Sequence, residues 1–383
     1  MVKVKHRHLL LFLLILQLTG CAAKQALPPQ PDAAPATSAP TGHMDLQYAT
    51  QFAVDTFADG AALVTIAGEE RYLLVPAGAD MPDIAQMPSF ADATVLRTPL
   101  QRMYLASSGA MDAFRRLNAM DCLRFTSTAA EDWSIEEARR ALHDGTLLYA
   151  GKYRSPDYEL LVSEGCTLAI ENTMLFHNPA TREQLESLGI PVLVERSSYE
   201  THPLGRMEWI KLYGLLTGKA DEAEAFFARE TAALEPILNA ESTGKTVAFF
   251  YRSPSGSINV RRPGDYLSAM LTLAGGIYVP AELDAADNAL STVNIQPEAF
   301  YAGAKDADVL IYNSNIYPLD SLAQLLAMDE LFADFKAVRE GNVWCAGANV
   351  FQETTAVGGM IADFHAVLSG TASDDLTYLH KLK

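Results

Sequence analysis

Arginine and tyrosine side chains recur at positions that we predict to lie in loops between strands and helices. They are Arg102, Tyr104, Arg196, Tyr199, Arg206, Tyr251, Arg252, Arg261 and Arg262. The formal net charge of the chain is −18, so arginines at strand ends stand out from an acidic background. Arginine offers fixed pairs of donors to carboxylates and phosphates, and aromatic faces pack on flat rings. The pattern predicts a site for a bulky anion, although any single arginine also suits a surface position with a packed stem.

Two serines lie between Tyr104 and the first predicted helix, which begins at residue 111. Ser107 and Ser108 lie in the sequence YLASSGAMDAF. The free N–H groups at a helix start can hold an anionic group, and we therefore include both serines in the candidate ligand site. Serine is also a common N-cap without any ligand, so both interpretations stay open.

The sequence offers no recognisable catalytic motif. The motifs G-x-S-x-G, H-E-x-x-H and Walker A are all missing, so we predict a protein that is not an enzyme and needs no cofactor. His177, His202 and His365 would be the ligands in an alternative hypothesis of a zinc- or manganese-binding protein. The chain has no histidine-rich loop, which makes this hypothesis the weaker one.

The first residues resemble a bacterial lipoprotein signal. A basic start and an apolar run too short to span a bilayer lead into Leu18-Thr19-Gly20-Cys21. The resemblance implies that Cys21 becomes the lipid-modified first residue of the mature chain, and an ordinary secretory signal is the alternative. Residues 22–43 are rich in Pro, Ala, Ser and Thr, so we expect a tether that spaces the folded chain from a membrane.

The charge of the chain argues against one class of partner, and its cysteine content predicts the state of the thiols. An acidic chain repels phosphate backbones, which argues against a nucleic-acid partner. Beyond Cys21 the chain has Cys122, Cys166 and Cys345, an odd number without C-x-x-C spacing. We expect mostly buried, small apolar residues, with a Cys122–Cys166 disulfide left open.

Hydrophobic periodicity divides the chain into strands and helices. A strand-rich start is followed by two blocks of alternating helices and strands, which indicates parallel sheets in two lobes. The predicted strands are 52–54, 62–66, 71–75, 167–170, 191–194, 246–251, 309–312 and one near 343. The predicted helices are 111–120, 135–143, 158–163, 179–188, 206–217, 221–238, 266–273, 321–328 and 355–368.

Several segments, in this order, resemble the substrate-binding proteins of ABC importers for iron siderophores, haem and cobalamin. They are SPDYELLVSEGCTLAIEN, REQLESLGIPVLVERSSYE, THPLGRMEWIKLYGLLTGKADEAEAFFARE, LAGGIYVP and STVNIQPEAFYAGAKDADVLIY. The resemblance covers most of residues 89–370 and lies in the order of the segments more than in any one of them. It implies an α/β fold of two lobes with mainly parallel central sheets, joined by a single long α-helix. Ligand would bind in the cleft between the lobes, which would close only slightly.

The resemblance also implies roles for individual residues. Glu159 and Glu298, one in each lobe, match the glutamates that the family presents to arginines of the membrane permease. The alternative is that each is a solvated acid favoured by the helix dipole. The loop that carries Asn349, Phe351 and Gln352 matches a loop from which the family often draws cleft residues.

Together these observations predict a signal peptide at 1–21, a tether at 22–43, an N-terminal lobe at 44–219, an interlobe helix at 220–240 and a C-terminal lobe at 241–383. The predicted protein is a lipid-anchored, extracytoplasmic and monomeric binding protein. It would deliver an iron-siderophore, haem or cobalamin to an ABC permease dimer with its ATPase. A surface lipoprotein without a transport role is a further alternative. The sequence leaves the chelate open and gives no function for the strand-rich residues 44–88.

Overall fold

The computed structural model describes residues 39–81, 90, 92–281, 292–373 and 376–383. The predicted signal peptide, Cys21 and residues 22–38 of the predicted tether lie outside this part of the chain. None of the described helices is both long enough and apolar enough to cross a bilayer.

The strand-rich start forms a sheet of its own, here called the N-terminal sheet. Its strands, in spatial order, are β1 (Gly42–His43), β2 (Phe52–Thr56), β3 (Ala62–Ile66), β4 (Glu70–Pro76) and β5 (Thr94–Thr98). All neighbours are antiparallel except β4 and β5, which are parallel. Because Gly42 pairs with Thr56, the ordered sheet begins within the predicted tether, two residues before the expected start of the N-terminal lobe.

The N-terminal lobe, here residues 103–199, is built on a parallel sheet. Its spatial order is β12 (Val192–Glu195), β11 (Ala169–Asn172), β6 (Met103–Leu105), β7 (Leu123–Thr126) and β8 (Leu148–Tyr149). The helices are α1 (Met111–Arg116), α2 (Glu136–His143), α3 (Tyr158–Ser163) and α4 (Pro179–Ser187), with a small hairpin of β9 (Gly151–Lys152) and β10 (Ser155–Pro156). Short 3-10 helices are η3 (Ser108–Ala110), η4 (Met120–Cys122), η5 (Ala130–Asp132), η6 (Thr173–His177) and η7 (Ser197–Tyr199).

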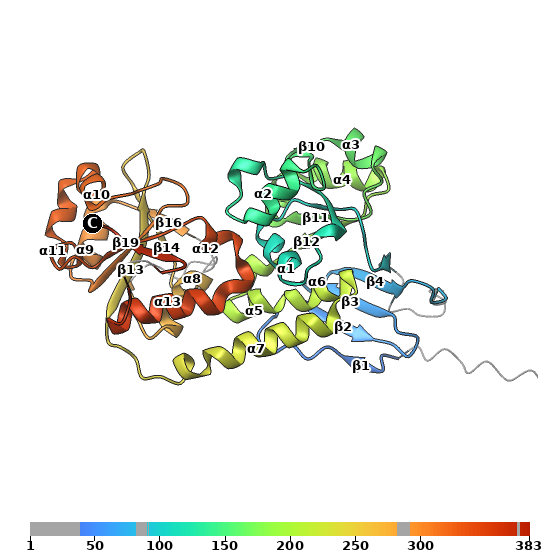
Figure 1. The fold of residues 1–383 in the computed structure, drawn as a ribbon, viewed down its shortest axis with the longest axis horizontal. Coiled ribbons are helices and arrows are strands. Elements are labelled where there is room, and N and C mark those ends of the chain that lie inside the picture. The colour runs from blue at the N-terminus through green and yellow to red at the C-terminus, as the bar shows by residue number, and fades with distance from the viewer. Residues whose placement is uncertain (1–38, 82–89, 91, 282–291, 374–375) are drawn as a thin grey trace, which may run out of the picture. The chain divides into compact units, whose positions relative to one another are not determined.

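Three helices lead from this lobe to the next. They are α5 (Pro203–Glu208), α6 (Ile210–Thr217) and α7 (Ala220–Leu238). Gly218 ends α6 in the left-handed conformation, with φ of 72°, which lets the chain turn sharply into α7. Asp221 and Glu222 lie in the first turn of α7, where the helix dipole favours acids. In Figure 1 the N-terminal sheet lies beside α6 and α7, and α13 runs along α7 at the other lobe.

The C-terminal lobe, here residues 246–383, contains a mixed sheet. Its path is β16 (Thr292–Ile295), β14 (Ile258–Arg261), β13 (Thr246–Arg252), β17 (Val309–Asn313), β18 (Val343–Ala346) and β19 (Leu379–Lys381), and β15 (Ile277–Tyr278) also pairs with β13. The helices are α8 (Tyr266–Leu273), α9 (Pro297–Ala304), α10 (Leu322–Met328), α11 (Lys336–Arg339), α12 (Asn349–Gln352) and α13 (Val357–Ser369), with η8 (Glu330–Asp334) and η9 (Thr354–Ala356). Parallel pairing of β13, β17 and β18 forms the centre of this sheet.

The fold class predicted from the sequence is confirmed: two α/β lobes with mainly parallel central sheets are joined by a long helix, α7. A continuous apolar core runs from the N-terminal sheet through the helices α5 to α7 into both lobes, and it includes Phe52, Trp209, Phe227 and Phe364. Cys122, Cys166 and Cys345 are free thiols, so the two cysteines considered for a disulfide are not paired.

Candidate ligand site between the lobes

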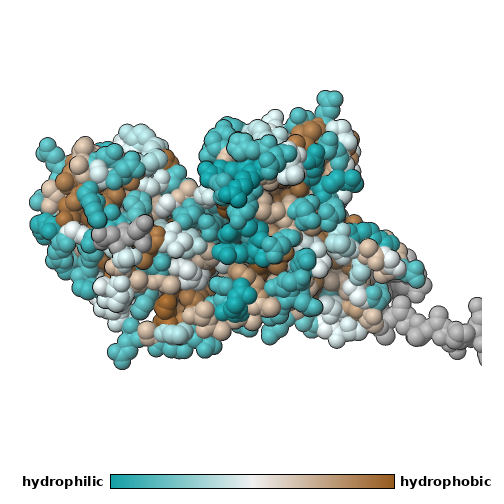
Figure 2. All heavy atoms as spheres, in the orientation of Figure 1, coloured by the Kyte–Doolittle hydropathy of each residue, from teal (hydrophilic) through white to brown (hydrophobic). Residues whose placement is uncertain are grey.

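The carboxyl ends of the parallel strands in the N-terminal lobe bring polar side chains to one edge. Ser107 follows β6, Asn172 ends β11 and Arg196 follows β12. Ligands of open α/β sheets bind at this edge, beyond the carboxyl ends of the strands. A hollow separates the two lobes in the space-filling view, and hydrophilic side chains cover much of the lobe surface beside it (Figure 2).

Arg196 is held at this edge by aromatic rings. Its guanidinium carbon lies 5.3 Å from the ring centre of Phe176 and 5.5 Å from that of Tyr199. Both rings are exposed, Phe176 by 47% and Tyr199 by 38%. Within the part of the chain that the structure describes, Arg196 has no ion pair, and its buried Nε has no hydrogen-bond partner. Its charge is therefore positioned without being neutralised, which suits an incoming anion.

A second group of arginines surrounds one tyrosine of the C-terminal lobe. The guanidinium carbon of Arg206, in α5, lies 3.7 Å from the ring centre of Tyr266 at the start of α8. The guanidinium of Arg261 lies 5.8 Å from the same ring and 5.4 Å from that of Phe351. Asp265 pairs with Arg261 at 3.4 Å, whereas Arg206 has no ion pair among the described residues. Two positive charges therefore share one ring, and only that of Arg261 has a carboxylate partner among the described residues.

The other cationic and aromatic candidates of the C-terminal lobe are less available. Arg252 lies 3.8 Å from Asp329, which partly neutralises it. Tyr251 packs against Tyr317, with their ring centres 5.8 Å apart, where β13 ends. Arg262 is half-buried, and its backbone carbonyl accepts a hydrogen bond from the Ser268 hydroxyl at 2.9 Å.

Two predicted ligand residues lie away from this edge, because their segment is a strand and not a loop. Arg102 precedes β6, so it lies at the amino end of the sheet, and its guanidinium packs against Gly165 after α3. Tyr104 lies inside β6 and is fully buried under the outer helices of the lobe. Burial raises the pKa of the Tyr104 hydroxyl well above its usual range. Neither residue is placed to contact a ligand between the lobes.

The serines also differ from the expectation. The Ser107 hydroxyl donates to Oε2 of the buried Glu195 at 2.9 Å and caps no helix. Ser108 begins the short η3, and the first α-helix starts only at Met111. The Ser107 side chain makes no cap bond, so the plain N-cap considered from the sequence is not found, and the anion-binding role of the two serines stays a prediction.

The two amides of the C-terminal loop are engaged within the protein. The Asn349 amide donates to the carbonyl of Thr377 at 2.9 Å. The Gln352 carbonyl oxygen accepts from the backbone N–H of Ser134 at 2.7 Å, and its amide donates to the carbonyl of Asp132 at 2.7 Å. Gln352 therefore joins the two lobes instead of facing open solvent. Sequence reasoning could not find this bond because its two ends are 218 residues apart.

Sequence reasoning missed Phe176, Tyr266 and Glu195. Phe176 and Tyr266 are the rings on which Arg196 and Arg206 lie. Tyr266 begins a predicted helix after the arginines of 261–262, and Glu195 directly follows a predicted strand before Arg196, whereas Phe176 lies far from any predicted arginine in the sequence. An aromatic residue in the position of Tyr266 would have been a usable signal.

Glu159 and Glu298, for which the sequence predicts a docking role, have similar positions in the two lobes. Each is exposed and occupies the first turn of its helix, Glu159 in α3 of one lobe and Glu298 in α9 of the other. Among the described residues neither forms an ion pair, so both carboxylates are available to an external cation.

The three histidines of the metal hypothesis do not form a cluster with other metal-ligating side chains, and two of them make separate contacts within the protein. The His202 ring stacks on Tyr48, with centres 4.4 Å apart, and its Nδ1 accepts from the backbone N–H of Leu204. The His365 ring contacts the carbonyl of Ala274 at 3.0 Å. No cluster of three or more metal-ligating side chains occurs among the residues that the structure describes.

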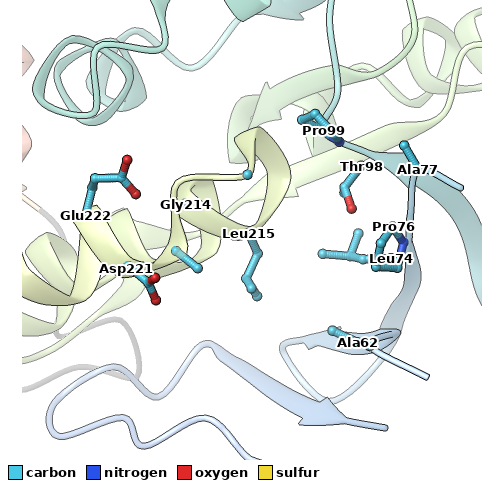
Figure 3. A pocket seen from close by; sticks show the side chains of 13 residues that line it. Ala62, Leu74, Pro76, Ala77, Thr98, Pro99, Gly214, Leu215, Asp221 and Glu222 are labelled. Atoms are coloured by element: carbon cyan, nitrogen blue, oxygen red, sulfur yellow. The ribbon is translucent and has the colours of Figure 1, made fainter. Parts of the chain in front are cut away.

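A cavity of about 430 Å³ lies outside the interlobe region, between the N-terminal sheet and the turn from α6 to α7. Leu74, Pro76 and Leu215 give it apolar walls, and Asp221 lies at one end (Figure 3). It contains none of the predicted ligand residues.

Comparison with known proteins agrees with the two-lobed fold. A family model described as "Periplasmic binding protein" matches residues 123–349. The uncharacterized lipoprotein MJ0878 of Methanocaldococcus jannaschii is 25% identical over 57% of this chain and 52% of its own length, so the chain spans about half of that relative. A second lipoprotein of that organism, MJ0872, is 22% identical over 85% of this chain and 83% of its own length.

Solved structures share the fold at low identity. A periplasmic haem-binding protein from Pseudomonas aeruginosa has a TM-score of 0.57 and 17% identity, covering 74% of this chain and 98% of that one. A structure described as an ABC-type Fe3+-hydroxamate transport system, from Saccharomonospora viridis, has a TM-score of 0.52 and 19% identity, covering 70% of this chain and 93% of that one. With the family model matching more than half of its residues, the chain belongs to the periplasmic binding protein family.

Proposed function

We propose that this protein is the lipid-anchored, extracytoplasmic substrate-binding component of an ABC importer, and that it captures an anionic metal chelate between its lobes. The observation that carries the proposal is the pair of arginines without ion pairs, Arg196 and Arg206, each lying on an aromatic ring. A chain with a net charge of −18 that keeps two guanidinium groups free of carboxylates is suited to an anionic ligand.

The ligand class follows from the mixture of rings and charges. Phe176 and Tyr199 offer exposed aromatic surface in one lobe, and Tyr251 and Tyr317 form an aromatic pair in the other. A chelate with flat apolar parts and several anionic groups, such as a ferric siderophore, haem or a corrinoid, would pack on the rings and pair with the arginines. The metal arrives with its coordination supplied by the chelator, so the protein itself needs no metal-ligand cluster.

Membrane anchoring would occur through Cys21, and two relatives from Methanocaldococcus jannaschii are also named lipoproteins. Two acyl chains on one residue would hold the protein at the membrane surface, where its permease lies. Residues 22–38 would then span the distance to the folded chain.

Ligand delivery would depend on Glu159 and Glu298 pairing with arginines of the permease dimer. A double charge reversal, Glu159→Lys with Glu298→Lys, should abolish uptake and leave ligand affinity nearly unchanged, because both side chains are exposed on outer helices. Uptake by cells and ligand titration of the purified variant are measured together. A large loss of affinity would show instead that these residues act on the ligand site.

The proposed ligand class is tested by calorimetric or fluorescence titration against ferric siderophores, haemin, cobalamin and free zinc. Saturable binding of one chelate supports the proposal and identifies its ligand. Binding of zinc alone would replace the proposal with a free-metal importer. Binding of nothing in the panel would favour a surface lipoprotein without a transport role.

A further inference from the structure

The two lobes are connected by hydrogen bonds from four consecutive residues, Gln352 to Thr355, here called the interlobe latch. All four residues lie between β18 and α13 of the C-terminal lobe, and each contacts the N-terminal lobe. Here every residue of one short segment makes at least one such contact.

The first half of the latch closes on the loop after β7. The side-chain oxygen of Gln352 accepts from both the backbone N–H and the hydroxyl of Ser134, each at 2.7 Å. Its amide donates to the carbonyl of Asp132 at 2.7 Å. Next along the chain, Glu353 lies 3.5 Å from Nη2 of Arg115 in α1 and also accepts from the Tyr378 hydroxyl at 3.1 Å.

The second half closes on the start of α1. The Thr354 hydroxyl donates to the carbonyl of Gly109 at 2.7 Å. A Cβ atom at Gly109 would lie 3.0 Å from Cγ2 of Thr354, so the two lobes approach closely here. The backbone N–H of Thr355 donates to Oδ2 of Asp112 at 3.1 Å, and the Thr355 hydroxyl donates to the same oxygen.

Asp112 makes this contact costly to break. Its side chain is fully buried, and Nε of Arg115 donates to Oδ1 at 2.9 Å. Among the described residues, the donors to Oδ2 both belong to Thr355 of the opposite lobe. Separation of the lobes would leave that carboxylate oxygen without its donors until water replaced them, and bonds to charged groups are among the stronger ones in proteins.

We propose that the interlobe latch holds the lobes at one fixed spacing before any ligand binds, and that its release is a separate step that must precede wide opening. The latch would therefore add to the stiffness of α7 in limiting lobe motion. This inference concerns the protein alone and does not depend on the ligand proposed above.

Hydrogen–deuterium exchange of the full chain in detergent, without ligand, tests the latch directly. The amides of Ser134 and Thr355 are themselves interlobe donors, so their exchange reports latch opening. We expect slow exchange at both in the unmodified protein. Gln352→Ala should speed exchange at both amides, although its side chain contacts only Ser134 of the pair. Asn349→Ala is the matched control, because that amide bonds only within its own lobe, and it should leave both amides slow.

Two results would overturn the proposal. One is exchange at unprotected rates for both amides in the unmodified protein. The other is an effect of Gln352→Ala on Ser134 alone, which would mean that the bonds act independently and do not form one latch. If Gln352→Ala fails to fold, Gly109→Cys with Thr354→Cys decides: ready disulfide formation without ligand supports the fixed spacing, and failure to form contradicts it.

Discussion

The short helix α5 carries two charged residues, on different faces, whose surroundings are opposite. Glu208 faces the N-terminal sheet, where its carboxylate accepts from the backbone N–H groups of Gln47, Tyr48 and Ala49 at 2.8–2.9 Å and pairs with Lys211 at 3.1 Å. Arg206, two residues earlier, lies on Tyr266 and has no carboxylate partner among the described residues. The carboxylate of Glu208 thus has a full set of partners, whereas the guanidinium of Arg206 has only the ring contact, and we have proposed it as a ligand contact.

The same contrast extends beyond α5. Glu200 is fully buried and accepts from the backbone N–H groups of Thr50 and Gln51 and from the Trp209 indole at 2.8–3.0 Å. Together Glu200 and Glu208 hold residues 47–51, which lead into the N-terminal sheet. This gives the strand-rich start a structural role: it is bound to the helices that connect the lobes. Buried charge with complete partners indicates architecture, and charge without them indicates a site.

The largest effect on stability should come from removing a buried carboxylate that has a full set of hydrogen-bond and ion-pair partners. Glu208→Ala leaves three backbone N–H groups without their acceptor and the buried Lys211 with only the exposed Glu224 as a carboxylate partner, and we expect a loss of roughly 3–5 kcal/mol in the free energy of unfolding. Denaturant unfolding measures it. Glu224→Ala is the control, because Glu224 pairs with the same lysine at 3.0 Å but is 59% exposed, and it should cost about 0–1 kcal/mol. Equal effects of the two variants would remove the distinction drawn between the faces of α5.

Removing a guanidinium group that has no carboxylate partner should lower ligand affinity and leave the free energy of unfolding nearly unchanged. Arg206→Gln should weaken binding of the chelate by about 1.5–3 kcal/mol, roughly 10- to 150-fold, with little change in unfolding. Arg102→Gln removes an arginine at the opposite end of the sheet and should leave affinity unchanged. Titration of both variants with the chelate found for the unmodified protein measures the difference. If Arg102→Gln were the more damaging change, the site would not be at the carboxyl edge.

Glu171 is a third case, because it is a buried acid whose carboxylate lacks the partners that Glu200 and Glu208 have. Both its carboxylate oxygens are buried without a partner among the described residues, and burial raises its pKa to about 8 from a usual value of 4.5. The folded state therefore retains a proton that the unfolded chain has released. Stability from this group is complete below pH 4.5 and is lost as the pH rises to about 8.

We expect a loss of about 2 kcal/mol in the free energy of unfolding between about pH 6 and pH 8 from this group. Denaturant unfolding at a series of pH values measures the slope. Glu171→Gln keeps the shape and removes the titration, so its stability should vary less over this range. An unchanged slope in the variant would assign the pH dependence to other residues.

The sequence could predict most of the elements but only part of the site. Regular periodicity placed α3 at 158–163 and α8 at 266–273 as the structure has them, because long apolar repeats report local structure. The strand β6 has three residues, which is too short for any periodic signal, so Tyr104 was expected in a loop and is in fact buried. Gln352 was expected to face the ligand, and its interlobe bond depends on tertiary packing that no local pattern encodes.

The smallest effect on ligand affinity should come from Tyr266, and its variants test whether this residue positions the arginines or contacts the ligand itself. Tyr266 is the ring shared by Arg206 and Arg261, and cation–π contacts contribute about 0.5–2 kcal/mol. Tyr266→Leu should therefore lower chelate affinity by roughly 2- to 30-fold, because both guanidinium groups would lose the ring against which they pack but keep their charge. Tyr266→Phe retains the ring and should bind as the unmodified protein does. If Tyr266→Phe were as weak as Tyr266→Leu, the hydroxyl would contact the ligand, and Tyr266 would itself belong to the binding residues.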